Sequence, residues 1–160
     1  MIKRAAVLGS PISHSLSPLI HNHAYSLLGF SGSYQAIEVK SGQLASYLEQ
    51  EFFKEDLLGF SLTMPLKEEL TAISNPALLV DSRSKEINSA NTIYRDGDIW
   101  RTTSTDVDGF EFLTKDLSFS SVAILGAGGT ARAAIAALAP RGIKIEVYRR
   151  SSDRDLSLIN

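Results

Sequence analysis

The side chains best suited to chemistry in this chain follow its expected strands. Ser15 and Ser17 stand one residue apart in the segment HSLSP, just after the apolar run AAVLG. Two hydroxyls at this spacing could bind a small anion. Ser17 could instead be only a helix N-cap, with Pro18 at the first helical position. The residue types leave both interpretations open.

Two further polar groups follow later strands, and their members supply hydroxyls, carboxamides, a lysine and an aspartate: Ser61, Thr63, Lys67, Asn88, Asn91, Thr105 and Asp106. Ligands of α/β sheets bind at the carboxyl ends of strands, so these groups predict a site for a small polyhydroxylated acid. A lysine beside an aspartate can act as a general acid–base. Spacing alone favours the alternative, an ordinary first-turn helix lysine paired with Glu68 or Glu69.

A glycine-rich turn stands between an apolar strand pattern and an alanine-rich helix pattern. Its residues fit the G-x-G-x-x-G/A dinucleotide fingerprint, with alanine in third place: Gly126, Ala127, Gly128, Gly129, Thr130 and Ala131. Such a turn lets backbone N–H groups and a helix N-terminus approach a pyrophosphate. We favour nucleotide binding over a purely structural turn because the context is right on both sides.

The end of the next strand indicates which dinucleotide would bind. Glu146 lies at the separation expected for a ribose-binding acid, but the strand continues past it to Arg149 and Arg150, with Arg154 close by. Guanidinium groups suit a 2′-phosphate. We therefore expect NADP rather than NAD; the alternative is a solvated basic strand end.

The patterns that must position these residues alternate between strands and helices. Strands are expected at 4–8, 34–39 and 58–62, and a hairpin joins 90–94 to 98–102. Helices are expected from the Ser17 N-cap to about 28, over 43–53 behind a Ser41-Gly42 cap, from Pro65 onward, over 77–87 and over 107–117. A strand, glycine turn, helix and strand follow, and Pro140 and Gly142 end that helix. This order predicts an α/β fold with a mostly parallel sheet. After residue 106 the pattern changes to a connecting helix followed by the glycine-turn unit, which predicts a boundary between domains 1–106 and 107–160.

Composition excludes several other classes of protein. The 160 residues are 44% hydrophobic and 21% charged, and the net charge of −2 gives no reason to expect nucleic acid. There is no cysteine, and no apolar run approaches the ~20 residues of a membrane span. The N-terminus contains no targeting pattern. We expect a cytoplasmic protein without membrane or metal partners.

In this order the motifs resemble the shikimate dehydrogenase family. The resemblance is carried by GSPISHSLSP, LTMPLKEE, SANTIYR, STDVDGF and LGAGGTARAA. It implies a shikimate-binding N-terminal domain followed by the start of a Rossmann-type NADP domain. The implied activity is the NADP-dependent, reversible reduction of 3-dehydroshikimate to shikimate by a monomer or homodimer.

The resemblance also implies roles for particular residues. Ser15 and Ser17 would hold the shikimate carboxylate, and Lys67 would be the general acid–base. Thr63, Asn91 and Asp106 would contact the substrate, and Asp106 would also pair with Lys67. The glycine turn, with Arg149, Arg150 and Arg154, would hold NADP. His14 is expected to support its loop rather than act in catalysis.

Three departures from the family pattern qualify these expectations. Ser61 and Ser104 stand where many members have asparagine, and Tyr148 stands where asparagine is common. Family members are also longer, so the chain corresponds to their N-terminal portion and the NADP domain would be incomplete. A dehydrogenase that also accepts quinate, a fragment that binds shikimate without reducing it, and a folate-type dehydrogenase remain alternatives; HSLSP argues against the last.

Overall fold

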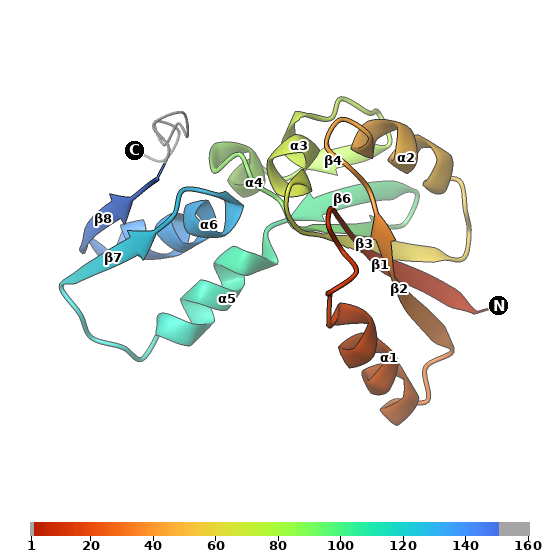
Figure 1. Cartoon of the computed structure of the whole chain (residues 1–160), viewed down its shortest axis with the longest axis horizontal. Coiled ribbons are helices and arrows are strands. Elements are labelled where there is room, and N and C mark those ends of the chain that lie inside the picture. Colours follow the sequence, from red (N-terminus) through yellow and green to blue (C-terminus); the bar gives the residue numbers. More distant parts are fainter. Residues whose placement is uncertain (1, 151–160) are drawn as a thin grey trace.

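A computed structural model describes residues 2–150 of the chain (Figure 1). Its first part is a six-stranded sheet with helices on both faces. The elements of this part are β1 (Lys3–Gly9), α1 (Ser17–Leu27), β2 (Gly32–Glu38), α2 (Leu44–Glu51), β3 (Leu57–Leu62), α3 (Leu66–Ala72), β4 (Leu78–Val80), α4 (Ser82–Glu86), β5 (Thr92–Asp96) and β6 (Ile99–Thr103). The expected α/β fold with a mostly parallel sheet is confirmed.

A smaller unit follows the sheet. α5 (Thr105–Thr114) leads to β7 (Ser121–Leu125), α6 (Gly129–Leu138), a 3₁₀ turn (Ala139–Arg141) and β8 (Lys144–Tyr148). β7 and β8 pair in parallel, so 121–148 form the expected β-α-β unit. Gly142 follows the 3₁₀ turn with a left-handed φ of 67°, which ends the helical stretch as expected.

The sheet order brings the polar segments to one edge. The strands run β2-β1-β3-β5-β6-β4, and β1 and β3 are parallel with Leu8 opposite Leu62. β5 is antiparallel to both β3 and β6, so its beginning lies at the same edge as their ends. The segments after β1, β3 and β6 and the segment before β5 therefore meet there.

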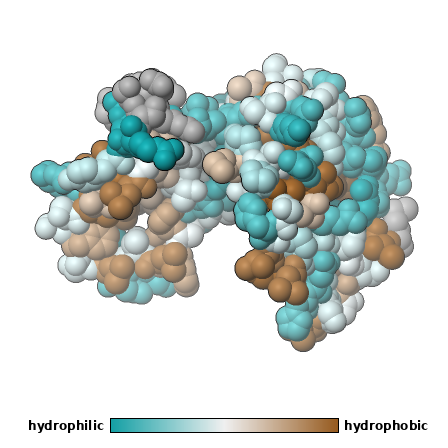
Figure 2. Space-filling model, viewed as in Figure 1, coloured by the Kyte–Doolittle hydropathy of each residue, from teal (hydrophilic) through white to brown (hydrophobic). Residues whose placement is uncertain are grey.

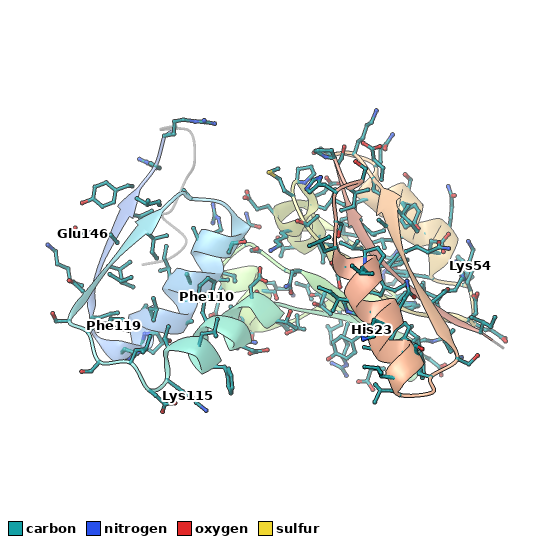
Figure 3. The ribbon with its side chains drawn as sticks, turned by 60° about the horizontal axis from the view of Figure 1, so that its bottom comes forward. His23, Lys54, Phe110, Lys115, Phe119 and Glu146 are labelled. Carbon is teal, nitrogen blue, oxygen red and sulfur yellow. The ribbon has the colours of Figure 1, made fainter. Side chains whose placement is uncertain are left out.

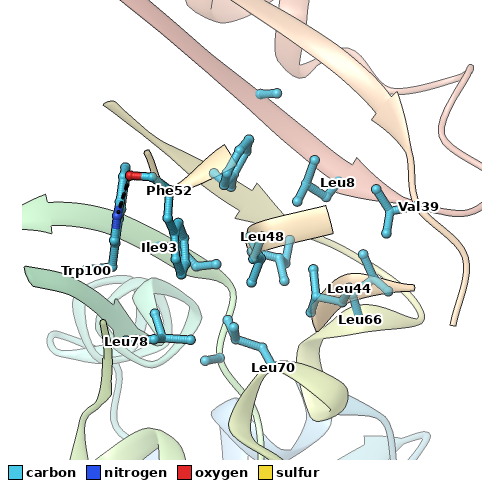
Figure 4. Packing of buried hydrophobic residues seen from close by; sticks show 14 of the residues in the cluster. Leu8, Val39, Leu44, Leu48, Phe52, Leu66, Leu70, Leu78, Ile93 and Trp100 are labelled. Atoms are coloured by element: carbon cyan, nitrogen blue, oxygen red, sulfur yellow. Dashed lines mark hydrogen bonds between the residues drawn. The ribbon is translucent and has the colours of Figure 1, made fainter. Parts of the chain in front are cut away.

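Alternation along β1 creates two apolar layers. Ala6 and Leu8 face α2 and α3, and they belong to the larger core cluster. Val7 faces the opposite side and packs with Ile12 and Tyr34. In the larger core, Phe52 stacks on Trp100 at 4.8 Å between ring centroids, and the Trp100 indole N–H donates to the Phe52 carbonyl at 3.4 Å (Figure 4).

The helix expected over 77–87 is wrong in its first part, and only Ser82–Glu86 are helical. Leu78 and Val80 are buried on either side of exposed Leu79, and the three residues form β4 against β6. Asp81 then starts α4 by accepting a hydrogen bond from the Ser84 N–H at 2.6 Å. Pairing with β6 overrides helix propensity here, and the local sequence pattern gives no sign of that partner.

Both expected serine caps are also wrong. The N-cap of α1 is Leu16, and Ser17 is the first helical residue; the Ser15 hydroxyl accepts from the Ser17 N–H at 3.3 Å. The N-cap of α2 is Gln43. N–H groups at the start of α2 are bonded by a side chain distant in sequence: the Glu69 carboxylate accepts from Gly42 at 2.9 Å and from Leu44 at 3.2 Å.

α1 contacts the sheet mainly through polar and aromatic side chains, and its leucines stay exposed. Asn22 bonds both backbone groups of Tyr34, donating to its carbonyl and accepting from its N–H, each at 2.9 Å. Since β2 is an edge strand, the asparagine takes the place of a missing neighbour. His21 stacks on the Tyr34 ring at 4.0 Å.

Replacing Asn22 should loosen this attachment. We expect Asn22→Ala to lower the free energy of unfolding by about 1 kcal/mol, because two hydrogen bonds to an edge strand are lost. Chemical denaturation followed by circular dichroism measures the change. His23→Ala, an exposed neighbour on α1 (Figure 3), is the matched control and should stay within about 0.5 kcal/mol of the parent. Equal losses in both variants would contradict this account of how α1 is held.

Candidate functional site

An ion pair lies at the centre of the polar edge. Lys67, on the first turn of α3, places its Nζ 2.5 Å from Oδ2 of Asp106, on the first turn of α5. Asn91 donates to the other carboxylate oxygen, Oδ1, at 2.8 Å. The Lys67 side chain is 16% exposed and that of Asp106 is 24% exposed. The pair is thus sheltered but reachable from solvent.

Backbone hydrogen bonds hold these three residues in place. The Lys67 carbonyl accepts from the Ala90 N–H at 2.9 Å, and the Asn91 carbonyl accepts from Leu62 at 2.7 Å. The Asn91 side chain exchanges two hydrogen bonds with Thr105, accepting from its N–H at 2.9 Å and donating to its hydroxyl at 3.0 Å. Asn91 therefore links the start of β5 to the start of α5, and it fixes Asp106 relative to Lys67.

The segments after β1 and β3 are in contact. Thr63 donates its N–H to the Leu8 carbonyl at 2.9 Å, and Ser10 donates to Met64 at 3.1 Å. A Cβ added to Gly9 would lie 2.5 Å from the Thr63 side chain, so only glycine lets the two chain segments approach so closely. The polar segments are therefore neighbours.

Ser15 and Ser17 are not bonded to the ion pair. They lie at the start of α1, beyond this contact, and no hydrogen bond within residues 2–150 joins them to Lys67, Asn91 or Asp106. Ser61 lies within β3 on the face opposite Phe60 and Leu62, which is the face that α1 covers. The structure brings the lysine, aspartate and asparagine together and leaves the serine pair at a neighbouring position on the edge.

The glycine turn lies at the carboxyl end of β7, as the fingerprint predicts. Gly126 has a φ of 116°, which disfavours any other residue, and its N–H bonds the Tyr148 carbonyl at 2.8 Å. α6 begins at Gly129 with Gly128 as N-cap, and no side chain caps it. A Cβ on Gly126 or Gly128 would meet nothing within 4 Å, so the turn borders open space.

The beginning of α6 packs directly against the ion pair. A Cβ on Gly129 would lie 2.6 Å from Oγ of Ser89 and 3.2 Å from Cβ of Lys67. The Thr130 hydroxyl accepts from Lys67 Nζ at 3.3 Å. Behind this contact, Ile87 and Val107 form an apolar cluster with Ala133 and Ala137 of α6.

Sequence reasoning missed the roles of Ser89 and Arg132 in this packing. Ser89 is 1% exposed against Gly129, and Arg132 is 3% exposed and donates to the Ile87 carbonyl at 3.4 Å. Ser89 lies in the segment SANTIYR and Arg132 in LGAGGTARAA, yet neither residue type at its position signals a contact between distant elements.

A hollow of about 1000 Å³ adjoins the ion pair. It is bordered by Thr63 and Lys67, by the glycine turn, and by an aromatic side formed by Phe110 and Phe119. The space-filling view shows a notch between the two parts of the molecule, and Figure 3 shows the stretch from Phe110 to Phe119 that runs along the smaller part. Ser15, Ser17, Asn91 and Asp106 do not border the hollow, which is therefore mainly a feature of the glycine-turn side.

The strand that follows the glycine helix carries the other predicted cofactor residues. Glu146 pairs with Lys144 at 2.6 Å and accepts from the Tyr148 hydroxyl at 3.2 Å. The Lys144 hydrogen bond, and then that of Tyr148, lower the pKa of Glu146. Arg149 and Arg150 follow β8 and are exposed, and Arg154 lies outside the described residues. Glu146 is thus bonded within its own strand.

The described helices include none that is long and apolar enough to cross a bilayer. Within residues 2–150, no group of three or more histidine or acidic side chains is placed to hold a metal ion.

Taken together, the fold and the site define an α/β protein whose lysine–aspartate pair lies at strand ends and against a glycine-turn helix. Comparison with known proteins gives the family. Residues 7–93 match the family model described as the shikimate dehydrogenase substrate binding domain. The chain belongs to the shikimate dehydrogenase family.

Several relatives are similar over nearly the whole chain. The NADP(+) shikimate dehydrogenase of Hyphomonas neptunium is 36% identical over 92% of this chain, and that of Helicobacter acinonychis is 35% identical over 94%. These matches cover 55% and 57% of the relatives, so the chain spans slightly more than half of their length.

Solved structures are similar to the same extent. The Thermus thermophilus shikimate 5-dehydrogenase in complex with shikimate has a TM-score of 0.83 at 34% identity, covering 98% of this chain and 60% of that one. The Mycobacterium tuberculosis enzyme has a TM-score of 0.80 at 36% identity, covering 98% and 59%.

Gly129 provides a test of how α6 packs on the lysine. We expect Gly129→Ala to lower the free energy of unfolding by about 1–3 kcal/mol, because its methyl group would overlap buried Ser89. Gly109→Ala, within α5 and with nothing near the added Cβ, should instead be neutral or stabilising by up to about 1 kcal/mol. Chemical denaturation measures both.

A double variant checks the cause. Ser89→Gly in the Gly129→Ala background should recover part of the loss, since it removes the overlapping hydroxyl. No recovery would mean that the loss does not arise at this contact.

Proposed function

We propose that this chain binds shikimate and 3-dehydroshikimate at the polar edge of its first domain, residues 1–106. We further propose that it takes part in their NADP-dependent, reversible interconversion. The observation that carries the proposal is the Lys67–Asp106–Asn91 cluster, a sheltered ammonium and carboxylate beside a carboxamide at converging strand ends. The relatives named NADP(+) shikimate dehydrogenase, and the Thermus thermophilus structure solved with NADP(H) and shikimate, support the same substrate and cofactor.

The residue roles follow from the chemistry of each side chain. Lys67 would donate a proton to the oxygen of the carbonyl as it becomes an alkoxide, and in the reverse direction its neutral amine would remove the hydroxyl proton. Asp106 would hold the ammonium in place by charge and accept from a ring hydroxyl, and Asn91 would orient Asp106. An ammonium has three N–H donors. Asp106 and Thr130 take two, which leaves one for the substrate oxygen.

Ser15, Ser17 and Thr63 would fix the other end of the substrate. Ser15 and Ser17 lie at the start of an 11-residue helix, where hydroxyls and N–H groups favour a carboxylate. Thr63 contacts the end of β1, from which the chain leads to that helix start, and it stands four residues before Lys67. Binding the carboxylate at one end would set the ring before the proton moves at the other.

The second part of the chain, 107–160, would begin the NADP domain. The residues present fit a dinucleotide: the turn Gly126–Ala131 has an uncapped helix start, and the positions of two of its glycines border open space. Arg149, Arg150 and Arg154 would suit the 2′-phosphate, and Glu146 is bonded to Lys144. When bound, the reduced cofactor supplies the hydride.

A binding experiment tests the first half of the proposal. Shikimate titrated into the 160-residue chain by calorimetry, without cofactor, should give saturable binding. Ser15→Ala/Ser17→Ala should weaken it at least about tenfold, because two hydrogen bonds to a carboxylate are removed. Ser26→Ala, an exposed serine of the same helix, is the control and should bind as the parent does. Equal affinity in the double variant would mean that the two serines do not hold the ligand.

A turnover experiment tests the second half. NADPH absorbance is followed with 3-dehydroshikimate, and Lys67→Met should lower kcat by about 10²–10⁴ while changing shikimate affinity much less. The chain spans little more than half of its relatives' length, so binding without turnover is the second candidate function. Shikimate binding with no NADPH oxidation would identify it. Quinate offered beside shikimate separates a broader dehydrogenase from a strict one.

A further inference from the structure

We propose that Thr130, on the first turn of α6, is a positioning residue for Lys67. Its hydroxyl would hold the ammonium and connect the glycine turn to the proton donor. The inference rests on the proposed function for Lys67. It goes beyond the assigned roles, in which Thr130 serves only as part of the dinucleotide fingerprint.

The contact fixes the direction of the threonine hydroxyl. Lys67 Nζ lies 3.3 Å from Oγ1 of Thr130 and 2.5 Å from Oδ2 of Asp106. A lysine ammonium can only donate, so Thr130 must accept, and its own hydrogen must point away from Lys67. The hydroxyl can therefore bond a cation through its oxygen and an anion through its hydrogen at the same time.

The position of Thr130 at the start of α6 indicates which anion its hydroxyl would bond. Gly128 is the N-cap, so Thr130 is the second helical residue and its hydroxyl lies beside the uncapped N–H groups. These groups are the ones that a pyrophosphate would accept from. A hydroxyl that bonds both Lys67 and an anion held at this turn would connect the proposed proton donor to the cofactor phosphates through two hydrogen bonds.

Packing keeps Thr130 at this place. Gly129, immediately before it, lies against Ser89 and the Lys67 side chain so closely that a Cβ would overlap. One and two turns of α6 beyond Gly129, Ala133 and Ala137 pack on Ile87 and Val107. Thr130 itself is exposed, but the buried side of the helix that carries it fixes where its hydroxyl meets Lys67.

The consequence concerns the motion of the ammonium. With Asp106 and Thr130 both accepting, two of the three donors are fixed and the third is directed. With only Asp106, Nζ would rotate about its bond to Cε and lose that direction. Thr130 would therefore contribute to alignment of the proton with the substrate oxygen rather than to substrate affinity.

Competitive amine labelling tests the contact in the chain itself. Trace acetic anhydride is applied to the parent, Thr130→Val and Thr130→Ser over a range of pH. Mass spectrometry then gives the labelling of Lys67 relative to exposed Lys40. We expect Thr130→Val, which keeps the shape and removes the acceptor, to raise the relative labelling about threefold. Thr130→Ser restores the hydroxyl and should stay close to the parent.

The outcomes separate this inference from the proposed function. Unchanged labelling in Thr130→Val, or an equal rise in Thr130→Ser, overturns the role of the hydroxyl. Thermal melts of all three proteins must coincide, and a rise seen only with a lowered melt would assign the effect to helix packing and also overturn it. Shikimate calorimetry on the same samples is read independently. Failure to bind shikimate with a normal labelling response removes the proposed function and leaves the Lys67–Thr130 link standing.

Discussion

The ion pair between Lys67 and Asp106 is the contact at which the strand order and the packing of the two parts of the chain meet. Its two members lie 39 residues apart and start two different helices, α3 and α5. They meet because β3 ends and β5 begins at the same sheet edge, and because β6 returns the chain to that edge before α5. A partly buried ion pair stabilises a protein only when its geometry is good and other groups bond its charged atoms. Here Asn91 donates to the carboxylate and Thr130 accepts from the ammonium.

The two parts of the chain are joined at this pair rather than by a linker alone. α5 connects the six-stranded sheet to the β7-α6-β8 unit, and it packs against α6. Ile87 at the end of α4 completes the apolar cluster between them. The glycine turn borders open space at Gly126 and Gly128, and at Gly129 it packs against the Lys67 side chain. A ligand at this turn would therefore lie close to the polar edge.

Two of the errors in the expected elements arise because long-range partners replaced local ones. The segment 77–87 contains good helix formers, but Leu78–Val80 find a strand partner in β6. Ser41 looks like a cap, but the start of α2 is bonded by Glu69 from α3. The misplaced cap of α1 is local, because the Ser17 N–H donates to the Ser15 hydroxyl. The apolar side of α1 also stays largely exposed within the described residues, with Leu19 70% and Leu27 74% accessible, since Asn22 and His21 attach the helix to β2 (Figure 2).

The sequence by itself determined the kind of fold, the hairpin, the glycine turn and the identity of the polar residues. These depend on local periodicity, turn chemistry and motif spacing, which a chain carries without its partners. Only the tertiary structure decided that Lys67, Asp106 and Asn91 are bonded together, that α1 begins at Ser17 with Leu16 as its N-cap, and that Thr130 and Gly129 lie against the lysine. Those facts follow from strand order and helix packing, in which contacts between residues far apart in the chain set the geometry, and no local pattern encodes them.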